Sequence, residues 1–409
     1  MNGEGVAKID GKIALVPYAL IDETCEVKIK KDHSNYAECE LEKVTKSSSN
    51  RVVPPCPYFY ECGGCNLQHM TYDEQLKYKT LLVKKTIKKV AGIECEVLNT
   101  VPSLNQYNYR NKMSFAFNNN FIGFFKNNSN SVIDIKTCKL ASENINKLLS
   151  LAREYFAKFP QRDLLKNIVI REINNQILVG VVAKKNLELS DFYRILTKNF
   201  NKIGLFLIIN KRNDSVVLTN NQTHIDGIKA INITNFGINY SVDLLGFHQT
   251  NIDIQNKIYS EVLNLISNNT CVVNGFSGEG LLSAILSKKA KHVTGIEINQ
   301  TSHQSAEKLK KENNLSNLTN ILGDFNKHIT PLKSKADTLI LDPPKKGIGQ
   351  QFLKTLVGIK EIIYISCNPI ALSKDLRFLK EFYTIEKVEP FDMFPNTNNV
   401  ETVVKLTLK

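Results

Sequence analysis

From about residue 246 onward, short apolar runs alternate with stretches of helical length, and this rhythm constrains the fold more than any other feature. Short apolar strands separated by helices are typical of a parallel sheet that is buried on both faces. We therefore expect a doubly wound, Rossmann-like α/β domain, with strands at 271–274, 293–297, 320–322, 338–342 and 362–366. Two last apolar runs, 383–389 and 400–408, lack a helix-length insert between them, which predicts an antiparallel pair at the end of the sheet.

Two further segments precede this domain. Residues 1–50 alternate like short strands with glycines and charged turns between them, which suits a small β-barrel. A polar run from Lys46 to Asn50 and the later Pro54-Pro55 pair mark a boundary. Strand-like and helical patterns then follow one another to about residue 245, which predicts an α+β domain. The expected domains are therefore 1–50, 51–245 and 246–409.

The chain has 409 residues and a formal net charge of +13. Such an excess favours a polyanionic partner, because each neutralised phosphate releases counterions, although a basic composition without such a partner is the alternative. Thr71 and Glu74 are spaced as a capping box that opens a helix running to about Val90. The lysines of this helix form either a phosphate-facing surface or an ordinary solvated face: Lys77, Lys79, Lys84, Lys85, Lys88 and Lys89.

The sequence shows neither a membrane-spanning run nor a secretory signal, and both bear on the cellular location. No apolar run approaches the ~20 residues of a membrane span, and the first residues contain no apolar signal core. We therefore expect a cytoplasmic protein that binds no membrane. Its nine cysteines are an odd number, and in that compartment they predict metal ligands, core residues or nucleophiles rather than disulfides.

Ligand-type residues follow successive strands of the C-terminal segment. Gly278 and Gly280 lie in a turn between a strand and a helix, where they allow close approach of the backbone to a ligand. Glu297 ends the next strand, where a carboxylate can bind a ribose diol, and Asp324 follows the third strand, where it can contact an adenine base. The fourth strand ends in LDPPKKG, at Asp342. Each acid alone could merely cap a helix, but the glycine-rich turn and three acids, four ligand-type signals in order, predict a ligand crevice at one edge of the sheet.

A candidate nucleophile and a candidate base lie near the end of the chain. Cys367 follows the strand IIYI, and Asn368-Pro369 breaks that strand, so the thiol is expected at the same edge as the ligand crevice. Glu401, in FDMFPNTNNVETVV, is the natural candidate for a general base. The alternatives are a buried core cysteine and a surface acid at a strand edge.

Cysteines also cluster in the middle segment. Cys56, Cys62 and Cys65 lie in CPYFYECGGCNLQH, and Cys138 follows in VIDIKTC. Thiolates suit zinc or an iron–sulfur cluster, and zinc sites usually use two close pairs. Three local cysteines with one remote cysteine therefore favour an iron–sulfur cluster.

These motifs together resemble the RNA uracil-5-methyltransferases, and among them the 23S rRNA branch with an N-terminal TRAM domain and a [4Fe-4S] cluster. The likeness covers nearly the whole chain. GEGVAKIDGK resembles the start of a TRAM domain, which is an OB-like RNA-binding barrel, and CPYFYECGGCNLQHMTYDEQLKYK resembles the cluster signature. GFHQTN is similar to the family's F-x-Q-x-N element, ISCNP to its nucleophile motif and VETVV to its base motif. The chain departs from the family at Asn274-Gly275, where Asp-Leu is usual, at Asn399, often His, and at Lys345, commonly Arg.

The resemblance implies the fold, the cofactors and the partner. It implies an S-adenosylmethionine-binding Rossmann-like domain that methylates carbon 5 of a uridine in RNA, with 23S rRNA as the expected substrate. No obligate protein partner is inferred. The resemblance assigns the nucleophile to Cys367, the base to Glu401, and a [4Fe-4S] cluster to Cys56, Cys62, Cys65 and Cys138. It also implies that S-adenosylmethionine contacts Gln249, Phe276, Glu297, Asp324 and Asp342.

Three other functions stay open on the sequence. A tRNA 5-methyluridine methyltransferase would use the same motifs. An RNA cytosine-5-methyltransferase would also use a cysteine adduct, but no matching Pro-Cys or Thr-Cys pair follows a strand. A non-catalytic rRNA-binding factor is suggested by Asn274 and disfavoured by Cys367, Glu401 and Glu297.

Overall fold

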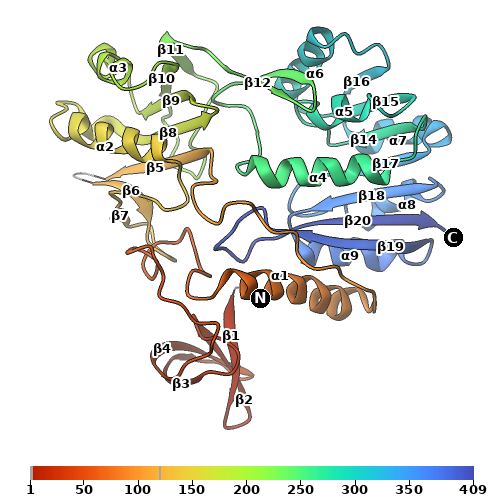
Figure 1. Cartoon of the computed structure of the whole chain (residues 1–409), viewed down its shortest axis with the longest axis horizontal. Coiled ribbons are helices and arrows are strands. Elements are labelled where there is room, and N and C mark those ends of the chain that lie inside the picture. Colours follow the sequence, from red (N-terminus) through yellow and green to blue (C-terminus); the bar gives the residue numbers. More distant parts are fainter. Residues whose placement is uncertain (1–2, 119–120) are drawn as a thin grey trace.

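The computed structural model describes residues 3–118 and 121–409. Figure 1 shows a small N-terminal sheet, a central sheet and a C-terminal sheet, each built from a continuous stretch of the chain. The N-terminal sheet has the strand order β1-β2-β4-β3, and among described residues no ladder joins β1 to β3 to close a barrel. Its strands are β1 Glu4–Ile9, β2 Lys12–Pro17, β3 Thr24–Asp32 and β4 Tyr36–Lys46.

The central sheet has seven strands in the order β11-β10-β9-β8-β5-β6-β7. Helices α2 and α3 cover one of its faces, where their apolar side chains pack against those of the strands. The strands are β5 Lys112–Asn118, β6 Phe121–Phe125, β7 Val132–Asp134, β8 Leu165–Ile173, β9 Gln176–Ala183, β10 Ile203–Ile209 and β11 Gln222–Gly227. The helices are α2 Glu143–Ala157, η2 Arg162–Leu164 and α3 Ser190–Thr197. A hairpin of β12 Ile231–Asn235 and β13 Ile238–Val242 leads to the C-terminal sheet.

The C-terminal sheet has seven strands in the order β16-β15-β14-β17-β18-β20-β19. The first five are parallel, and the last two are antiparallel to their neighbours, which confirms the predicted doubly wound sheet with an antiparallel end. The strands are β14 Cys271–Gly275, β15 His292–Glu297, β16 Leu318–Leu322, β17 Thr338–Leu341, β18 Glu361–Ser366, β19 Tyr383–Phe391 and β20 Glu401–Leu408.

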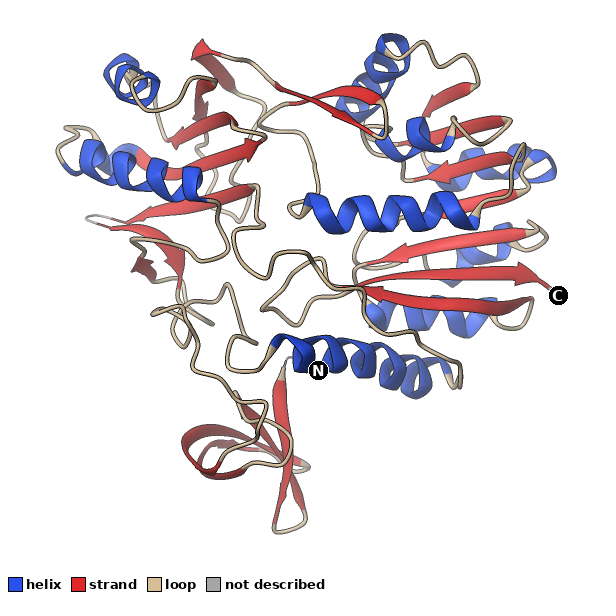
Figure 2. Cartoon of the chain, viewed as in Figure 1, coloured by secondary structure: helices blue, strands red, loops and turns tan. Residues whose placement is uncertain are grey.

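Helices lie in front of and behind this sheet, as Figure 2 shows. Those on one face are α4 Ile252–Leu265, α5 Leu281–Leu286 and α6 Gln300–Glu312. Those on the other face are α7 Phe325–Leu332, α8 Gln350–Leu356 and α9 Pro369–Leu379, with the short η3 Lys333–Lys335 between α7 and β17. In the part of the chain that the structure describes, no helix is long and apolar enough to cross a membrane.

Helix α1 (Tyr72–Thr86) continues as the π-helical turn η1 (Ile87–Ala91) and packs on the C-terminal sheet, although it lies far from that sheet in the sequence. Val83 and Ile87 share an apolar core with the side chains of α9. The predicted capping box is wrong, because the Thr71 side chain caps nothing and Glu74 accepts instead from the Asn50 amide at 3.1 Å.

Candidate active site

The carboxyl ends of the parallel strands meet at one edge of the C-terminal sheet, and the antiparallel strand β20 begins there. Ser366 of β18 pairs with Thr402 of β20. Beyond this pair, Cys367 follows Ser366 and Glu401 precedes Thr402. The candidate nucleophile and base therefore lie side by side at the ends of neighbouring strands. Asp342 follows β17, which is the other neighbour of β18.

A cavity of about 1030 Å³ opens at this edge. Its volume is at the upper end of the range for ligand sites, which suits two ligands side by side. It brings together seven of the nine residues that the sequence assigned to catalysis or to the cofactor: Gln249, Phe276, Gly278, Glu297, Asp342, Cys367 and Glu401. The other two, Gly280 and Asp324, lie at the same edge but outside the lining that the described residues form.

The glycine-rich turn is held in shape by backbone conformation and by Glu297. Phe276, Gly278 and Gly280 all have a left-handed backbone, with φ of 61°, 55° and 84°. That conformation is strained for a phenylalanine, and strain of this kind concentrates at functional sites. The Glu297 carboxylate accepts from the backbone N–H of Gly278 at 2.8 Å and of Asn299 at 2.7 Å. Glu297 therefore ties the turn after β14 to the end of β15.

The two glycines of this turn do different things. A side chain at Gly278 would meet nothing within 4 Å, because this residue faces the open cavity. A Cβ at Gly280 would lie 2.7 Å from that of Ala306 in α6. Gly278 thus leaves room for a ligand, whereas Gly280 allows α5 and α6 to pack closely.

Two polar side chains and one backbone carbonyl beside the cavity have partners within the protein. The buried Asn274 amide donates to the Ser283 hydroxyl at 2.9 Å and so holds the start of α5. Asp324 caps α7 by accepting from the backbone N–H of Asn326 at 3.0 Å. The backbone carbonyl of Gln249 accepts from the Asn111 amide at 2.8 Å, which leaves the Gln249 side chain free of that role.

Burial and neighbouring charges shift the acid–base groups of the cavity. Burial, together with Glu401 and Asp342, raises the pKa of the Cys367 thiol to about 11, while Lys345 opposes the shift. Burial and then Asp342 raise the pKa of Glu401 well above its usual range. Asp342 is open to the cavity, yet the loss of bulk water deep in it raises its pKa to about 7. A carboxyl with a raised pKa is a stronger base, as proton removal near neutral pH requires.

The four clustered cysteines line a second cavity, of about 360 Å³. Burial raises the pKa of Cys65 to about 12, and it also raises those of Cys62 and Cys138. Arg110 lines the same cavity and opposes all three shifts. Within residues 3–118 and 121–409, no three or more His, Cys, Asp or Glu side chains are grouped so that they could hold a metal ion. The side chains of the four cysteines would therefore have to converge to share a cluster.

Lys79 of α1 fits neither interpretation of the α1 lysines, which were a phosphate-facing surface and a solvated face. Lys79 is fully buried and pairs with the equally buried Asp392. It is therefore neither phosphate-facing nor solvated, and the interpretation of that lysine is wrong. By contrast, Lys84, Lys85, Lys88 and Lys89 are exposed. A lysine on an otherwise amphipathic helix offered no local signal, because its partner is 313 residues away.

The strand order of the C-terminal sheet and the cavity at its carboxyl edge are those of the S-adenosylmethionine-dependent methyltransferase fold. A tRNA (uracil-54, C5)-methyltransferase of Pyrococcus abyssi, solved in complex with S-adenosyl-L-homocysteine, has the same fold: it is 24% identical, with a TM-score of 0.79 over 99% of this chain and 100% of that one. This likeness confirms the predicted fold class.

Residues 71–409 match the family described as tRNA (Uracil-5-)-methyltransferase, and residues 1–41 match the TRAM domain. The chain belongs to this RNA uracil-5-methyltransferase family, as its motifs predicted. An uncharacterised RNA methyltransferase of Clostridium tetani is 33% identical over 99% of this chain and 94% of its own length. One of Listeria innocua is 32% identical over 100% of this chain and 95% of its own length. The protein is thus an S-adenosylmethionine-dependent RNA methyltransferase.

Proposed function

We propose that the protein methylates carbon 5 of a uridine in RNA through a covalent adduct on Cys367, with Glu401 as the base. The observation that carries this proposal is the register of β18 and β20, which sets Cys367 beside Glu401 in the cavity that the glycine-rich turn borders. A thiol, a buried acid and a donor site within one cavity are what this reaction needs.

The chemistry follows from the low reactivity of the uracil ring. Carbon 5 is a poor nucleophile until the Cys367 thiolate adds to carbon 6 and turns the ring into an enolate. S-adenosylmethionine supplies the methyl group as an electrophilic sulfonium, and carbon 5 takes it. Glu401 then removes the proton from carbon 5, the electron pair forms the C5–C6 double bond, and the C6–S bond breaks to release the thiolate.

The donor would lie along the glycine-rich turn. We assign the ribose hydroxyls to Glu297, whose oxygens each hold one backbone N–H and retain a free lone pair. Gln249, Phe276 and Asp342, which line the same cavity, are assigned to the rest of the donor. Asp324 lies at the same edge of the sheet, outside the cavity lining, and we assign it to the adenine.

For the substrate we propose 23S rRNA. The TRAM domain and the net charge of +13 support an RNA substrate. The resemblance of the cysteine motif to the 23S rRNA branch of the family is the reason to prefer that RNA to tRNA. Because the cavity is a recess at the sheet edge, the target base has to leave its stack to reach Cys367.

The test is transfer of label from S-adenosylmethionine to unmodified transcripts of 23S rRNA and of tRNA, followed by nucleoside analysis. Label in 5-methyluridine of the 23S transcript supports the proposal. The same label confined to tRNA would reassign the substrate, and label in 5-methylcytidine would overturn the reaction.

We also propose that Cys56, Cys62, Cys65 and Cys138 hold a [4Fe-4S] cluster. The support is that these four cysteines line one cavity, since four thiolates are the usual ligands of such a cluster. The reaction has no redox step, so the cluster would be structural. Anaerobic reconstitution should yield about four iron atoms per chain, by the stoichiometry of the cluster. Cys138→Ser should lower that content, whereas Cys271→Ser should not.

A further inference from the structure

The loop between β19 and β20, residues 392–400, delivers Glu401 to the cavity, and we call it the base loop. Phe391 pairs with Glu401 across the two strands, so the loop begins and ends at this pair. Most of its residues are buried, whereas loops usually run over the surface. A buried loop needs internal partners for its polar groups, and the identity of those partners determines what holds Glu401.

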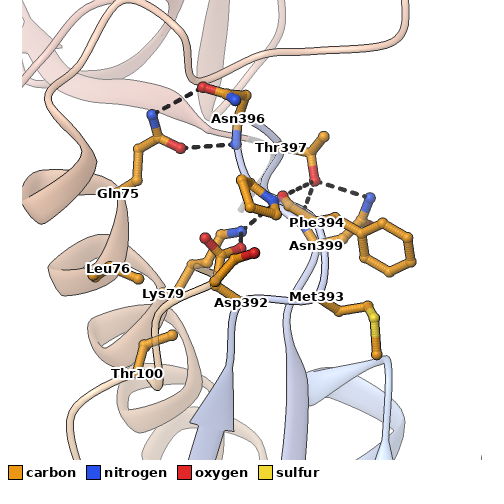
Figure 3. A network of polar contacts seen from close by, with 12 residues as sticks. Gln75, Leu76, Lys79, Thr100, Asp392, Met393, Phe394, Asn396, Thr397 and Asn399 are labelled. Atoms are coloured by element: carbon orange, nitrogen blue, oxygen red, sulfur yellow. Dashed lines mark hydrogen bonds and ion pairs between the residues drawn. The ribbon is translucent and has the colours of Figure 1, made fainter. Parts of the chain in front are cut away.

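Helix α1 supplies the first set of partners. The Lys79 ammonium donates to the Asp392 carboxylate and, at 3.0 Å, to the backbone carbonyl of Phe394. One turn earlier on the same face, the Gln75 amide donates to the Asn396 side chain at 3.3 Å and accepts from the Asn396 backbone N–H at 2.8 Å. Figure 3 shows both contacts reaching from α1 to the loop.

The segment that follows Cys65 supplies a second set of partners. Asn396 has a left-handed backbone, with φ of 68°, which turns its carbonyl towards that segment. The carbonyl accepts from the backbone N–H of Asn66 at 3.1 Å and of Leu67 at 3.0 Å. The Asn396 side chain also donates to the carbonyl of Gln106 at 2.7 Å. The base loop is therefore tied at its start and at its middle.

Apolar contacts dock α1 on the C-terminal sheet without the Lys79–Asp392 pair. The helix already packs through Val83 and Ile87 against the apolar side chains of α9. Replacement of a buried ion pair by apolar residues of similar volume is often neutral for stability or favourable. An apolar pair would form no directional hydrogen bonds. It could therefore not fix the positions of residue 392 and of the Phe394 carbonyl as Lys79 does.

We propose that Lys79 and Gln75 are positioning residues for Glu401, which act through the base loop on removal of the carbon 5 proton. This inference rests on the proposed function. If the loop loses its anchors, the thiolate can still add to carbon 6 and carbon 5 can still take the methyl group. The proton then stays on carbon 5, the C6–S bond does not break, and the methylated protein–RNA adduct accumulates.

The test compares two anchor variants, Lys79→Met with Asp392→Leu and, separately, Gln75→Met, in the full chain. Neither variant leaves a buried charge unpaired, because the first removes both partners of the ion pair and the second keeps that pair intact. The test therefore does not depend on the folding of the first variant alone. The control is Arg153→Met with Asp134→Leu. This variant removes an ion pair between α2 and β7 of the central sheet, in which the Arg153 guanidinium lies 2.5 Å from the Asp134 carboxylate. Thermal denaturation and S-adenosylmethionine affinity are measured for each protein.

Each protein is incubated with transcripts of 23S rRNA and tRNA that contain either uridine or 5-fluorouridine. Fluorine cannot leave carbon 5 as a proton does, so fluorinated RNA traps every enzyme whose earlier steps work. We expect the anchor variants to bind S-adenosylmethionine within about twofold of wild type and to form this trapped adduct. On uridine RNA we expect turnover to fall about 10- to 100-fold, as for a misplaced catalytic group, with a persistent adduct that wild type and control lack.

Wild-type turnover in a folded anchor variant would overturn the inference, and so would slower turnover without adduct on uridine RNA. Either result would leave the proposed function intact. Failure of the wild-type protein to form any adduct with fluorinated RNA would instead overturn the proposed function, and the inference with it.

Discussion

Cys367 lies beside two carboxyl groups, and its place at the end of β18 distinguishes it from the other half-buried cysteines. Cys271, for example, begins β14 and so lies at the opposite edge of the same sheet. A thiol with a pKa near 11 is mostly protonated at neutral pH, so the arrival of substrate has to help form the thiolate.

Cys367→Ala should lower methyl transfer at least about 10³-fold, because loss of a covalent nucleophile removes the whole pathway. S-adenosylmethionine affinity should stay within about twofold of wild type by calorimetry, since the Gly-rich turn and Glu297 are unchanged. Cys271→Ala is the matched control and should retain activity. Undiminished transfer by the Cys367 variant would exclude the adduct mechanism.

His69 provides a residue-level test of stability. It is fully buried beside Tyr18 and Phe59, and burial, with a smaller effect of Arg51, lowers its pKa to about 4 from 6.5. Between pH 6.5 and pH 4, His69 is therefore protonated in the unfolded chain but neutral in the folded protein. The free energy of unfolding falls as the pH falls through this range.

His69→Phe removes this titration. Relative to wild type, the free energy of unfolding of the variant should rise by roughly 2 kcal/mol between pH 7.5 and pH 5. Urea denaturation at the two pH values measures the difference, and an equal difference at both would contradict the assigned pKa.

At the scale of elements, the glycine-rich turn joins β14 to α5 and combines a packing role with a ligand role. Gly280→Ala would meet both an unfavourable backbone conformation and Ala306 of α6, so the free energy of unfolding should fall by about 2–4 kcal/mol. Gly278→Ala carries only the backbone cost of about 1 kcal/mol. Its methyl group enters the cavity, so its larger effect should be weaker binding of S-adenosylmethionine.

Chemical denaturation and calorimetry on the two variants separate these effects. Two results would contradict these assignments. One is a larger loss of stability in Gly278→Ala than in Gly280→Ala. The other is equal stability of the two variants with weaker binding of S-adenosylmethionine by Gly280→Ala.

The strands of the C-terminal sheet could be predicted because an apolar run bounded by polar residues is a local signal. The edge where Glu297, Asp342 and Cys367 meet followed from the same rhythm, since parallel strands end together. Other features could not be predicted in this way. Lys79 is buried because of Asp392, which is 313 residues away, and Glu74 is drawn from its capping position by Asn50.

At the scale of the whole molecule, the exposed lysines of α1 and η1 lie on a helix that docks on the catalytic sheet. Whether they bind phosphate or are merely solvated is decided by salt dependence, because each phosphate contact adds to the slope of log affinity against log salt. Replacement of Lys84, Lys85 and Lys89 by Gln should make that slope shallower by about 2 if they contact single-stranded RNA. An unchanged slope would make this a solvated face.

In the proposed mechanism, Cys367 stays bonded to carbon 6 of the uridine until Glu401 removes the carbon 5 proton, and the Glu401→Gln variant tests this most directly. The variant should methylate the ring and then stall, since glutamine cannot take the carbon 5 proton. Mass spectrometry of the digested complex should find a methylated uridine attached to the peptide that contains Cys367. A variant that is folded and binds S-adenosylmethionine, yet turns over normally or carries the nucleoside on another residue, would contradict the proposed mechanism.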